Sequence, residues 1–161
     1  MHNELEVIKA AQWLATTGTS ETIIKGYTSI KESYFKDMCT NSEKHRYGTH
    51  WLRCDEAYEA DRLYRLFIHL FGEKALHKVL DIVEFTILCK TYFTKFPTSI
   101  MSKNRIHFLI LSIRNGDAVV KNKCKSCGLP FVLHRDDCLE DTCHICRQLS
   151  KKISGDVGSG E

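Results

Sequence analysis

The sequence has no long apolar run, and its positive and negative charges nearly balance. Within the 161 residues, no apolar stretch approaches the ~20 residues that a membrane-spanning helix needs. The segment from Met1 to Glu6 is polar and acidic, which is untypical of a secretory signal peptide. A net charge of +3 neither demands nor excludes nucleic acid as a ligand. We therefore expect a cytoplasmic protein that does not associate with membranes.

The sequence also lacks the motifs that mark common active sites. It contains no G-x-S-x-G nucleophile elbow, no G-x-x-x-x-G-K-[ST] phosphate-binding loop and no H-E-x-x-H metalloprotease helix. Five histidines are dispersed in a way more typical of surface or packing residues than of bases or metal ligands: His45, His50, His69, His77 and His107. These absences predict that the chain is not an enzyme.

Two pairs of cysteines near the C-terminus predict a metal site. Cys124 and Cys127 form one C-x2-C pair, Cys143 and Cys146 form another, and 15 residues separate the pairs. Each tight turn directs two sulfurs to one side, so two turns can surround a single Zn²⁺ at about 2.3 Å. Four thiolates leave no open coordination position. The spacing therefore predicts one structural zinc ion per chain, without a catalytic role for the metal.

Two other interpretations of these thiols are weaker. Disulfides need an oxidising compartment, which the N-terminal sequence does not suggest, and a thioredoxin-like redox pair usually follows a strand in a βαβ unit, which the sequence does not indicate. Cys39, Cys54 and Cys89 lack the paired spacing and are expected to be small buried residues in helical segments. Cys138 and His134 lie between the two pairs, and we leave both out of the predicted coordination shell.

Hydrophobic periodicity predicts a mostly α-helical bundle that is followed by a small module resembling a zinc ribbon. Ser29 and Glu32 have the spacing of a capping box, and Gly116 is the predicted end of the last helix of the bundle. We expect helices over residues 4–16, 19–25, 29–38, 51–71, 73–93 and 98–115, with a polar connection over 40–48. Short strands are expected over residues 118–120 and 131–133. The predicted domains are a helical domain (1–116), a zinc-binding module (117–152) and a disordered tail (153–161).

Basic residues at two places are candidates for contact with DNA. The two predicted helices on either side of a glycine-containing turn near Gly26 suggest a helix-turn-helix, with Lys31 and Lys36 near a DNA groove. A helical corner without any role in DNA binding has the same pattern. Around the metal module the candidates are Lys121, Lys123, Lys125, Arg135, Arg147, Lys151 and Lys152. Four acidic residues lie among them, so an ordinary solvated surface also fits: Asp136, Asp137, Glu140 and Asp141.

The cysteine module resembles the zinc region of the FlhC family, the C subunit of the bacterial flagellar master transcription activator. The resemblance is carried by residues 124–134 (CKSCGLPFVLH) and 142–146 (TCHIC). Residues 113–119 (IRNGDAV) are similar to the end of a helix, the turn and the entering strand in that family. Weaker points of similarity are Gly18, Thr28, Ile30, Phe35 and Trp51. Together these residues extend the resemblance over roughly residues 4 to 147.

The resemblance implies a function beyond what the spacing predicts. Members of the family bind a smaller helical D subunit in a heterohexamer of four D and two C chains, which binds promoter double-stranded DNA and recruits RNA polymerase. Relatives on conjugative elements activate transfer genes instead of flagellar genes. By this resemblance Cys124, Cys127, Cys143 and Cys146 are the zinc ligands. The alternative hypothesis is a zinc-stabilised protein-interaction module that makes no direct contact with DNA.

Overall fold

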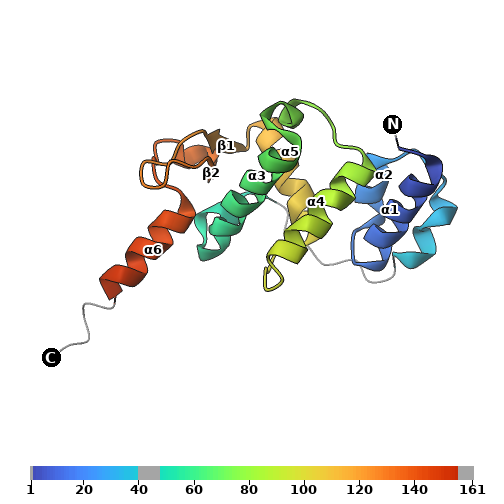
Figure 1. The fold of residues 1–161 in the computed structure, drawn as a ribbon, viewed down its shortest axis with the longest axis horizontal. Coiled ribbons are helices and arrows are strands. Elements are labelled where there is room, and N and C mark those ends of the chain that lie inside the picture. Colours follow the sequence, from blue (N-terminus) through green and yellow to red (C-terminus); the bar gives the residue numbers. More distant parts are fainter. Residues whose placement is uncertain (1, 40–47, 156–161) are drawn as a thin grey trace.

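A computed structural model describes residues 2–39 and 48–155 of the chain. In the described part there are six α-helices and one two-stranded sheet. The helices are α1 (Glu4–Thr16), α2 (Glu21–Tyr27), α3 (Tyr58–Phe71), α4 (Ile82–Lys95), α5 (Lys103–Asn115) and α6 (His144–Gly155). Strand β1 (Ala118–Lys121) pairs with β2 (Phe131–His134). The molecule is elongated, with α1 and α2 at one end and α6 at the other (Figure 1). Among the described residues, no helix has the length and apolar character to cross a membrane.

Polar side chains fix where several helices begin. Asn3 accepts a hydrogen bond from the backbone N–H of Glu6, and the Glu6 side chain accepts one from the N–H of Asn3. Asp81 and Glu84 form the same reciprocal pair at the start of α4. These capping boxes satisfy backbone donors that the first turn of a helix leaves unpaired.

One core runs through the helical body and continues into the sheet. Its largest buried side chains include Phe67 of α3 and Phe85 and Tyr92 of α4. Ala118 of β1 and Val132 of β2 belong to the same core, because β1 packs on α5 and β2 packs on α3. The sheet is therefore attached to the helical body by apolar packing.

The sheet has its opposite face toward the cysteines. The strands are antiparallel, with Val119 opposite Leu133 and Val120 opposite Val132. Side chains alternate between the two faces of a strand, so Val132 joins the main core while Phe131 and Leu133 pack with the cysteines in a second, smaller core. The two strands thus separate the helical core from the cysteine cluster. The prediction of a mostly helical fold with a C-terminal four-cysteine module is confirmed, as are both strands.

The predicted helix over residues 29–38 is wrong, and the helix-turn-helix that depended on it is wrong as well. The chain forms two short 3₁₀ turns there, Glu32–Tyr34 and Lys36–Met38. They are separated by Phe35, which has φ −143° and ψ −16° and is buried in the main core. Lys31 precedes the first turn without any side-chain cap, so the predicted capping box does not form. Burial of Phe35 takes precedence over the local helical pattern.

Three predicted helices begin later than their apolar pattern suggests. Residues 50–57 form 3₁₀ turns ahead of α3, and Glu73–His77 forms another ahead of α4. The helix predicted over 73–93 begins only after its cap at Asp81, and Val79 is 70% exposed instead of facing the core. Helix α5 begins after Ser102, whose side chain accepts from the N–H of Arg105. Ahead of each helix at least one apolar side chain is nevertheless buried: Leu52 before α3, Leu80 before α4 and Met101 before α5.

Two further boundaries differ from the sequence prediction or lie outside the structure. Helix α6 was not predicted, and it continues to Gly155, so the predicted start of a disordered tail at 153 is wrong. Residues 156–161 lie outside the described residues, as does the predicted connection over 40–48 except for Gly48. The predicted helix end at Gly116 is confirmed: α5 ends at Asn115, and the capping residue Gly116 has φ 79°.

Candidate metal centre

The first cysteine pair lies in the turn that joins β1 to β2. The N–H of Cys124 donates to the carbonyl of Leu129 at 2.9 Å, and the N–H of Gly128 donates to the carbonyl of Cys124 at 2.9 Å. Gly128 has φ +74°, a left-handed conformation that glycine adopts without strain. In this tight turn, two cysteines that are only three positions apart can both contribute a sulfur to one site.

The second pair lies where the chain enters α6. The N–H of Lys125 donates to the carbonyl of Asp141 at 2.8 Å, which joins the two turns through their backbones. The N–H of Cys143 donates to Cys124 Sγ at 3.2 Å, and the N–H of Cys146 donates to Cys143 Sγ at 3.4 Å. Backbone donors therefore point at the sulfurs before any metal is considered.

The four sulfurs form a compact group that could hold one metal ion. Every pair of these sulfur atoms lies within 4.8 Å, and Cys127 Sγ and Cys143 Sγ are 3.8 Å apart. Cys124 and Cys143 are buried, Cys146 is half-buried and Cys127 is exposed, and all four are free thiols. The predicted grouping of four cysteines is confirmed.

The remaining cysteines and His134 lie outside this group. His134 is engaged elsewhere, because its Nδ1 accepts from the N–H of Asp136 at 3.2 Å. Cys89 is buried as predicted, Cys39 is half-buried, and Cys54 and Cys138 are exposed, so the prediction that Cys54 is buried is wrong.

The pKa values of Cys124, Cys143 and Cys146 are shifted in different directions by their surroundings. Burial raises the pKa of the Cys124 thiol, but the backbone N–H groups of Cys143, Cys127 and Ser126 outweigh it and lower this pKa to about 6. Burial raises the pKa of Cys146 to about 12, with neighbouring cysteine sulfurs adding to the effect, and burial also raises the pKa of Cys143. The backbone donors thus favour the thiolate of Cys124, while Cys143 and Cys146 need a cation nearby to ionise.

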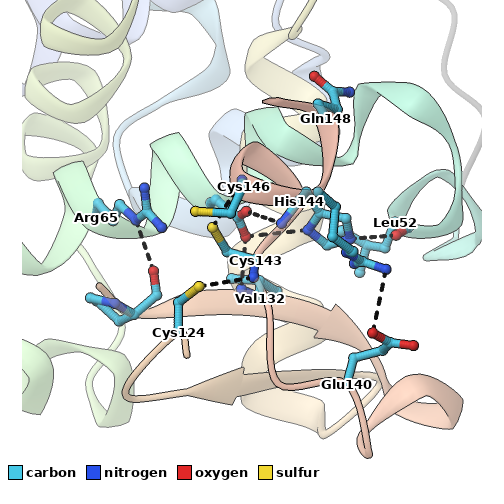
Figure 2. Close-up of polar contacts among 12 residues, drawn as sticks. Leu52, Arg65, Cys124, Val132, Glu140, Cys143, His144, Cys146 and Gln148 are labelled. Atoms are coloured by element: carbon cyan, nitrogen blue, oxygen red, sulfur yellow. Dashed lines mark hydrogen bonds and ion pairs between the residues drawn. The ribbon is translucent and has the colours of Figure 1, made fainter. Parts of the chain in front are cut away.

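Arg65 brings a positive charge from α3 to the edge of the cluster. Its Nε donates to the carbonyl of Pro130 at 2.8 Å, and its Nη2 donates to Cys127 Sγ at 3.7 Å. Figure 2 shows its guanidinium group beside the turn that carries the first cysteine pair. A cationic donor beside a thiolate stabilises the charged form of the sulfur. Arg65 therefore joins the helical body to the first pair electrostatically.

Asp61, one turn before Arg65 on α3, joins the helical body to the second pair. It is fully buried, and its Oδ1 accepts from the N–H of Val132 at 3.0 Å while its Oδ2 accepts from the N–H of His144 at 2.9 Å. His144 Nδ1 lies 3.3 Å from Asp61 Oδ1. A buried carboxylate is tolerated only when such donors satisfy it. One side chain of α3 therefore holds both β2 and the start of α6.

His144 lies between the two cysteines of the second pair and is itself fixed on both sides of its ring. Its Nε2 lies 3.0 Å from the carbonyl of Leu52, which can only accept, so this nitrogen donates (Figure 2). The opposite nitrogen faces Asp61. The ring is 8% exposed and points away from the sulfurs into the body. His144 is thus a support of the second pair and lies outside the group of ligand atoms.

Asp61, Arg65 and His144 were not predicted from the sequence as residues of the site. The available signal was the polar pair Asp61 and Arg65, one turn apart on an amphipathic helix, where they share one face. A histidine inside a C-x2-C pair was a second signal. Neither signal identifies the partner residues, because the two backbone N–H groups that donate to Asp61 lie 71 and 83 residues away in the sequence.

The structure does not bring the DNA-contact candidates into one patch. Lys31 and Lys36 follow α2 at one end of the molecule, and the other seven lie on the module and α6 (Figure 1). Four candidates have acidic partners within 4.0 Å: Lys36 with Glu32, Lys125 with Asp141, Arg135 with Asp117 and Arg147 with Glu140. In the described part of the chain, the structure gives no ion pair to Lys31, Lys121, Lys123, Lys151 or Lys152.

Comparison with known proteins does not assign this chain to a family. No protein-family model matches it, and no curated protein shows significant similarity to it. A functional argument therefore depends on the residues of the module and their geometry.

Replacing Asp61 with alanine is expected to weaken the attachment of the module. Two buried N–H groups, those of Val132 and His144, lose their acceptor, at a cost of roughly 1–3 kcal/mol for each. Asp61→Asn keeps one acceptor oxygen and should lose less. Urea denaturation measures the free energy of unfolding, and amide hydrogen exchange should accelerate at Val132 and His144 first. A free energy of unfolding for Asp61→Ala within about 0.5 kcal/mol of wild type would contradict this role of Asp61.

Arg65→Gln is expected to speed the loss of bound metal to a chelator, because Cys127 loses its cationic donor. Outer contacts of this kind typically change metal affinity by about 10–100-fold. Arg114→Gln is the matched control, since Arg114 Nε also donates to a backbone carbonyl, that of Leu76 at 3.1 Å, without contacting a cysteine. The transfer rate to a chromogenic chelator is the measurement. Equal rates for both variants would show that Arg65 acts only through the carbonyl of Pro130.

Proposed function

We propose that this chain is the zinc-stabilised C-type subunit of a DNA-binding transcription activator, related to the FlhC family and acting in the cytoplasm. In this proposal it works with a D-type partner at promoters of flagellar or conjugative-transfer genes and has no catalytic activity. The support is the resemblance in the cysteine module together with a four-thiol cluster that the fold uses as a scaffold. The cluster is the observation that carries the proposal.

Zinc is the metal that this ligand set fits best. Four thiolates around one ion at about 2.3 Å place neighbouring sulfurs about 3.8 Å apart in a tetrahedron. The distance between Cys127 Sγ and Cys143 Sγ is 3.8 Å. When bound, the ion cross-links the turn between the strands to the start of α6. A four-cysteine shell leaves no coordination position for a substrate or an activated water, so the proposed role is structural.

DNA contact is proposed for cations around the module that form no ion pair within residues 2–39 and 48–155. Lys121 and Lys123 lead from β1 into the first cysteine pair, and Lys151 lies on α6. Lys121 lies opposite Phe131 in the sheet and Lys123 directly precedes the buried Cys124, so these two lysines are held in a defined arrangement. Fixed cations of this kind are suited to phosphate groups of a duplex.

The second candidate function is a protein-interaction module that does not touch DNA. The observation that favours it is the exposed apolar surface of α6, where Leu149 is 55% and Ile153 is 71% exposed. The acidic residues around the second pair also reduce the attraction of the module for phosphate. Both candidate functions need the same metal-stabilised scaffold, and they differ in what the scaffold presents.

The purified native protein is expected to contain one zinc ion per chain. Cys124→Ser or Cys143→Ser should remove it and unfold the module locally, since metal binding supplies folding free energy to small sites. Cys138→Ser is the control, because Cys138 is exposed and outside the cluster. Elemental analysis and hydrogen exchange over β1 and β2 are the measurements. Native protein without zinc, or a Cys143→Ser variant with full zinc content, would overturn the assignment.

Binding to a promoter fragment, with the D-type partner present, is expected to weaken steeply with salt because neutralised phosphates release counterions. Reversing the charge of Lys121 and Lys123 should weaken binding and reduce the slope of log affinity against log salt by about one for each phosphate that is no longer neutralised. Charge reversal at Lys9 and Lys74, which are exposed on the helical body, is the control. If charge reversal at Lys121 and Lys123 leaves DNA binding unchanged, the result would favour the protein-interaction module. Binding of the promoter fragment that does not change with salt would favour it as well.

A further inference from the structure

Among the described residues, the hydrogen bonds that hold helix α6 to the helical body lie at its beginning. The N–H of His144 donates to Asp61, and Gln148 Nε2 donates to the carbonyl of Asp55. Beyond this point, residues 149–155 are all exposed. Figure 1 shows α6 extending from the module away from the helical body. A helix of this length is marginal in water on its own, so its outer turns depend on the first turn or on a further contact.

One side of α6 carries an apolar stripe beside a basic hollow. Ile145, Leu149 and Ile153 are spaced four residues apart, which places them on one face of the helix. The stripe borders a hollow of about 420 Å³ between α6 and the start of α3. The residues that line this hollow include two cations and no carboxylate. They are Tyr58, Arg62, Ile145, Gln148, Leu149 and Lys152.

Arg62 is held at this hollow by aromatic contacts. Its guanidinium carbon lies 4.7 Å from the ring centre of Tyr58 and 4.9 Å from that of Phe96. Glu59 lies 3.9 Å away, but it is buried and already accepts from Tyr92 and Ser99. The Arg62 side chain remains 38% exposed. A partially desolvated arginine fixed between rings is a strong site for a carboxylate.

We propose that this surface, the α6 face (Tyr58, Arg62, Ile145, Leu149, Lys152 and Ile153), binds an acidic amphipathic helix of a partner protein. Apolar residues of the partner cover Leu149 and Ile153, and its carboxylates pair with Arg62 and Lys152. This is recognition of a helix in a groove, with apolar anchors one turn apart. The proposal rests on the proposed function, which requires a heteromeric partner, and it specifies where that partner docks.

Three other occupants fit the α6 face less well. A second copy of the chain would bring Lys151 and Lys152 against their own counterparts, because α6 contains no acidic residue to offset them. A DNA backbone would pair with the lysines but leave Leu149 and Ile153 in water, since phosphate and sugar offer no apolar anchor. A lipid surface is flat and does not enter the hollow beside α3. An acidic amphipathic helix alone matches both the apolar stripe and the cations.

A peptide experiment tests the chemistry of the α6 face without an identified partner. The probe is a helical peptide of about 16 residues with leucines four apart and flanking glutamates, and its matched control replaces the glutamates with lysines. Fluorescence anisotropy with the full zinc-loaded chain should show binding of the acidic peptide only. Equal binding of both peptides, or of neither, overturns the proposal.

Variants then test the same surface with the purified D-type partner. Leu149→Ser combined with Ile153→Ser should weaken both the peptide and the partner complex at least about tenfold. The control is Ile100→Ser combined with Val79→Ser, because these side chains are 57% and 70% exposed on the helical body and match the exposure of the first pair. Zinc content and melting temperature show whether each variant is folded. Lys152→Glu should weaken binding of the acidic peptide. The affinity for the lysine peptide should stay undetectable or increase.

The outcomes separate this proposal from the proposed function. If the Leu149 and Ile153 changes leave the affinity for the partner intact, the proposal that the α6 face binds the partner is wrong. If the Leu149 and Ile153 changes abolish promoter binding but leave partner affinity unchanged, α6 contacts DNA and the α6-face proposal is wrong. The proposal is also wrong if these changes alter only binding to anionic phosphatidylserine vesicles. If the wild-type chain binds the acidic peptide but no D-type partner, the proposed function fails and the α6 face stands.

Discussion

The buried carboxylate of Asp61 is the interaction on which the arrangement of the two halves depends. It accepts from the backbone of β2 and from the first residue of α6, and both donors are buried. A charge in this position is unfavourable unless its hydrogen bonds are complete. The module can therefore occupy only the position in which Val132 and His144 reach this side chain. The cysteine cluster shapes the module, and Asp61 determines where the module lies.

Helix α3 connects two buried polar networks that face different ways. Glu59 accepts from Tyr92 and Ser99 and so joins α3 to α4 and to the segment before α5. Asp61, two residues later, faces the module, because residues two apart on a helix point to nearly opposite sides. Arg65 follows on the same side as Asp61 and reaches the first cysteine pair. Both halves of the protein are thus fixed to one helix, which explains why Glu59 and Asp61 are buried.

The features that sequence predicted correctly are those that neighbouring residues determine. The C-x2-C pairs form tight turns whose geometry depends on Gly128 and a few backbone hydrogen bonds. The strands and the end of α5 at Gly116 are similarly local. The helix boundaries around Phe35 and Asp81 were missed, because core burial and a capping box took precedence over apolar periodicity. The supports of the metal centre could not be predicted, since Asp61 and His144 are 83 residues apart in the sequence and are brought together by the tertiary fold.

The second cysteine pair overlaps the first turn of α6, and this overlap fixes the rotation of the helix about its own axis. Cys143 precedes the helix, Cys146 lies within it, and Leu149 and Ile153 follow without a break. Each residue advances an α-helix by about 100°. The cluster therefore determines the direction in which the exposed side chains of α6 point. One residue inserted between Cys146 and Leu149 would turn that face by roughly a quarter of a circle while leaving the cluster complete.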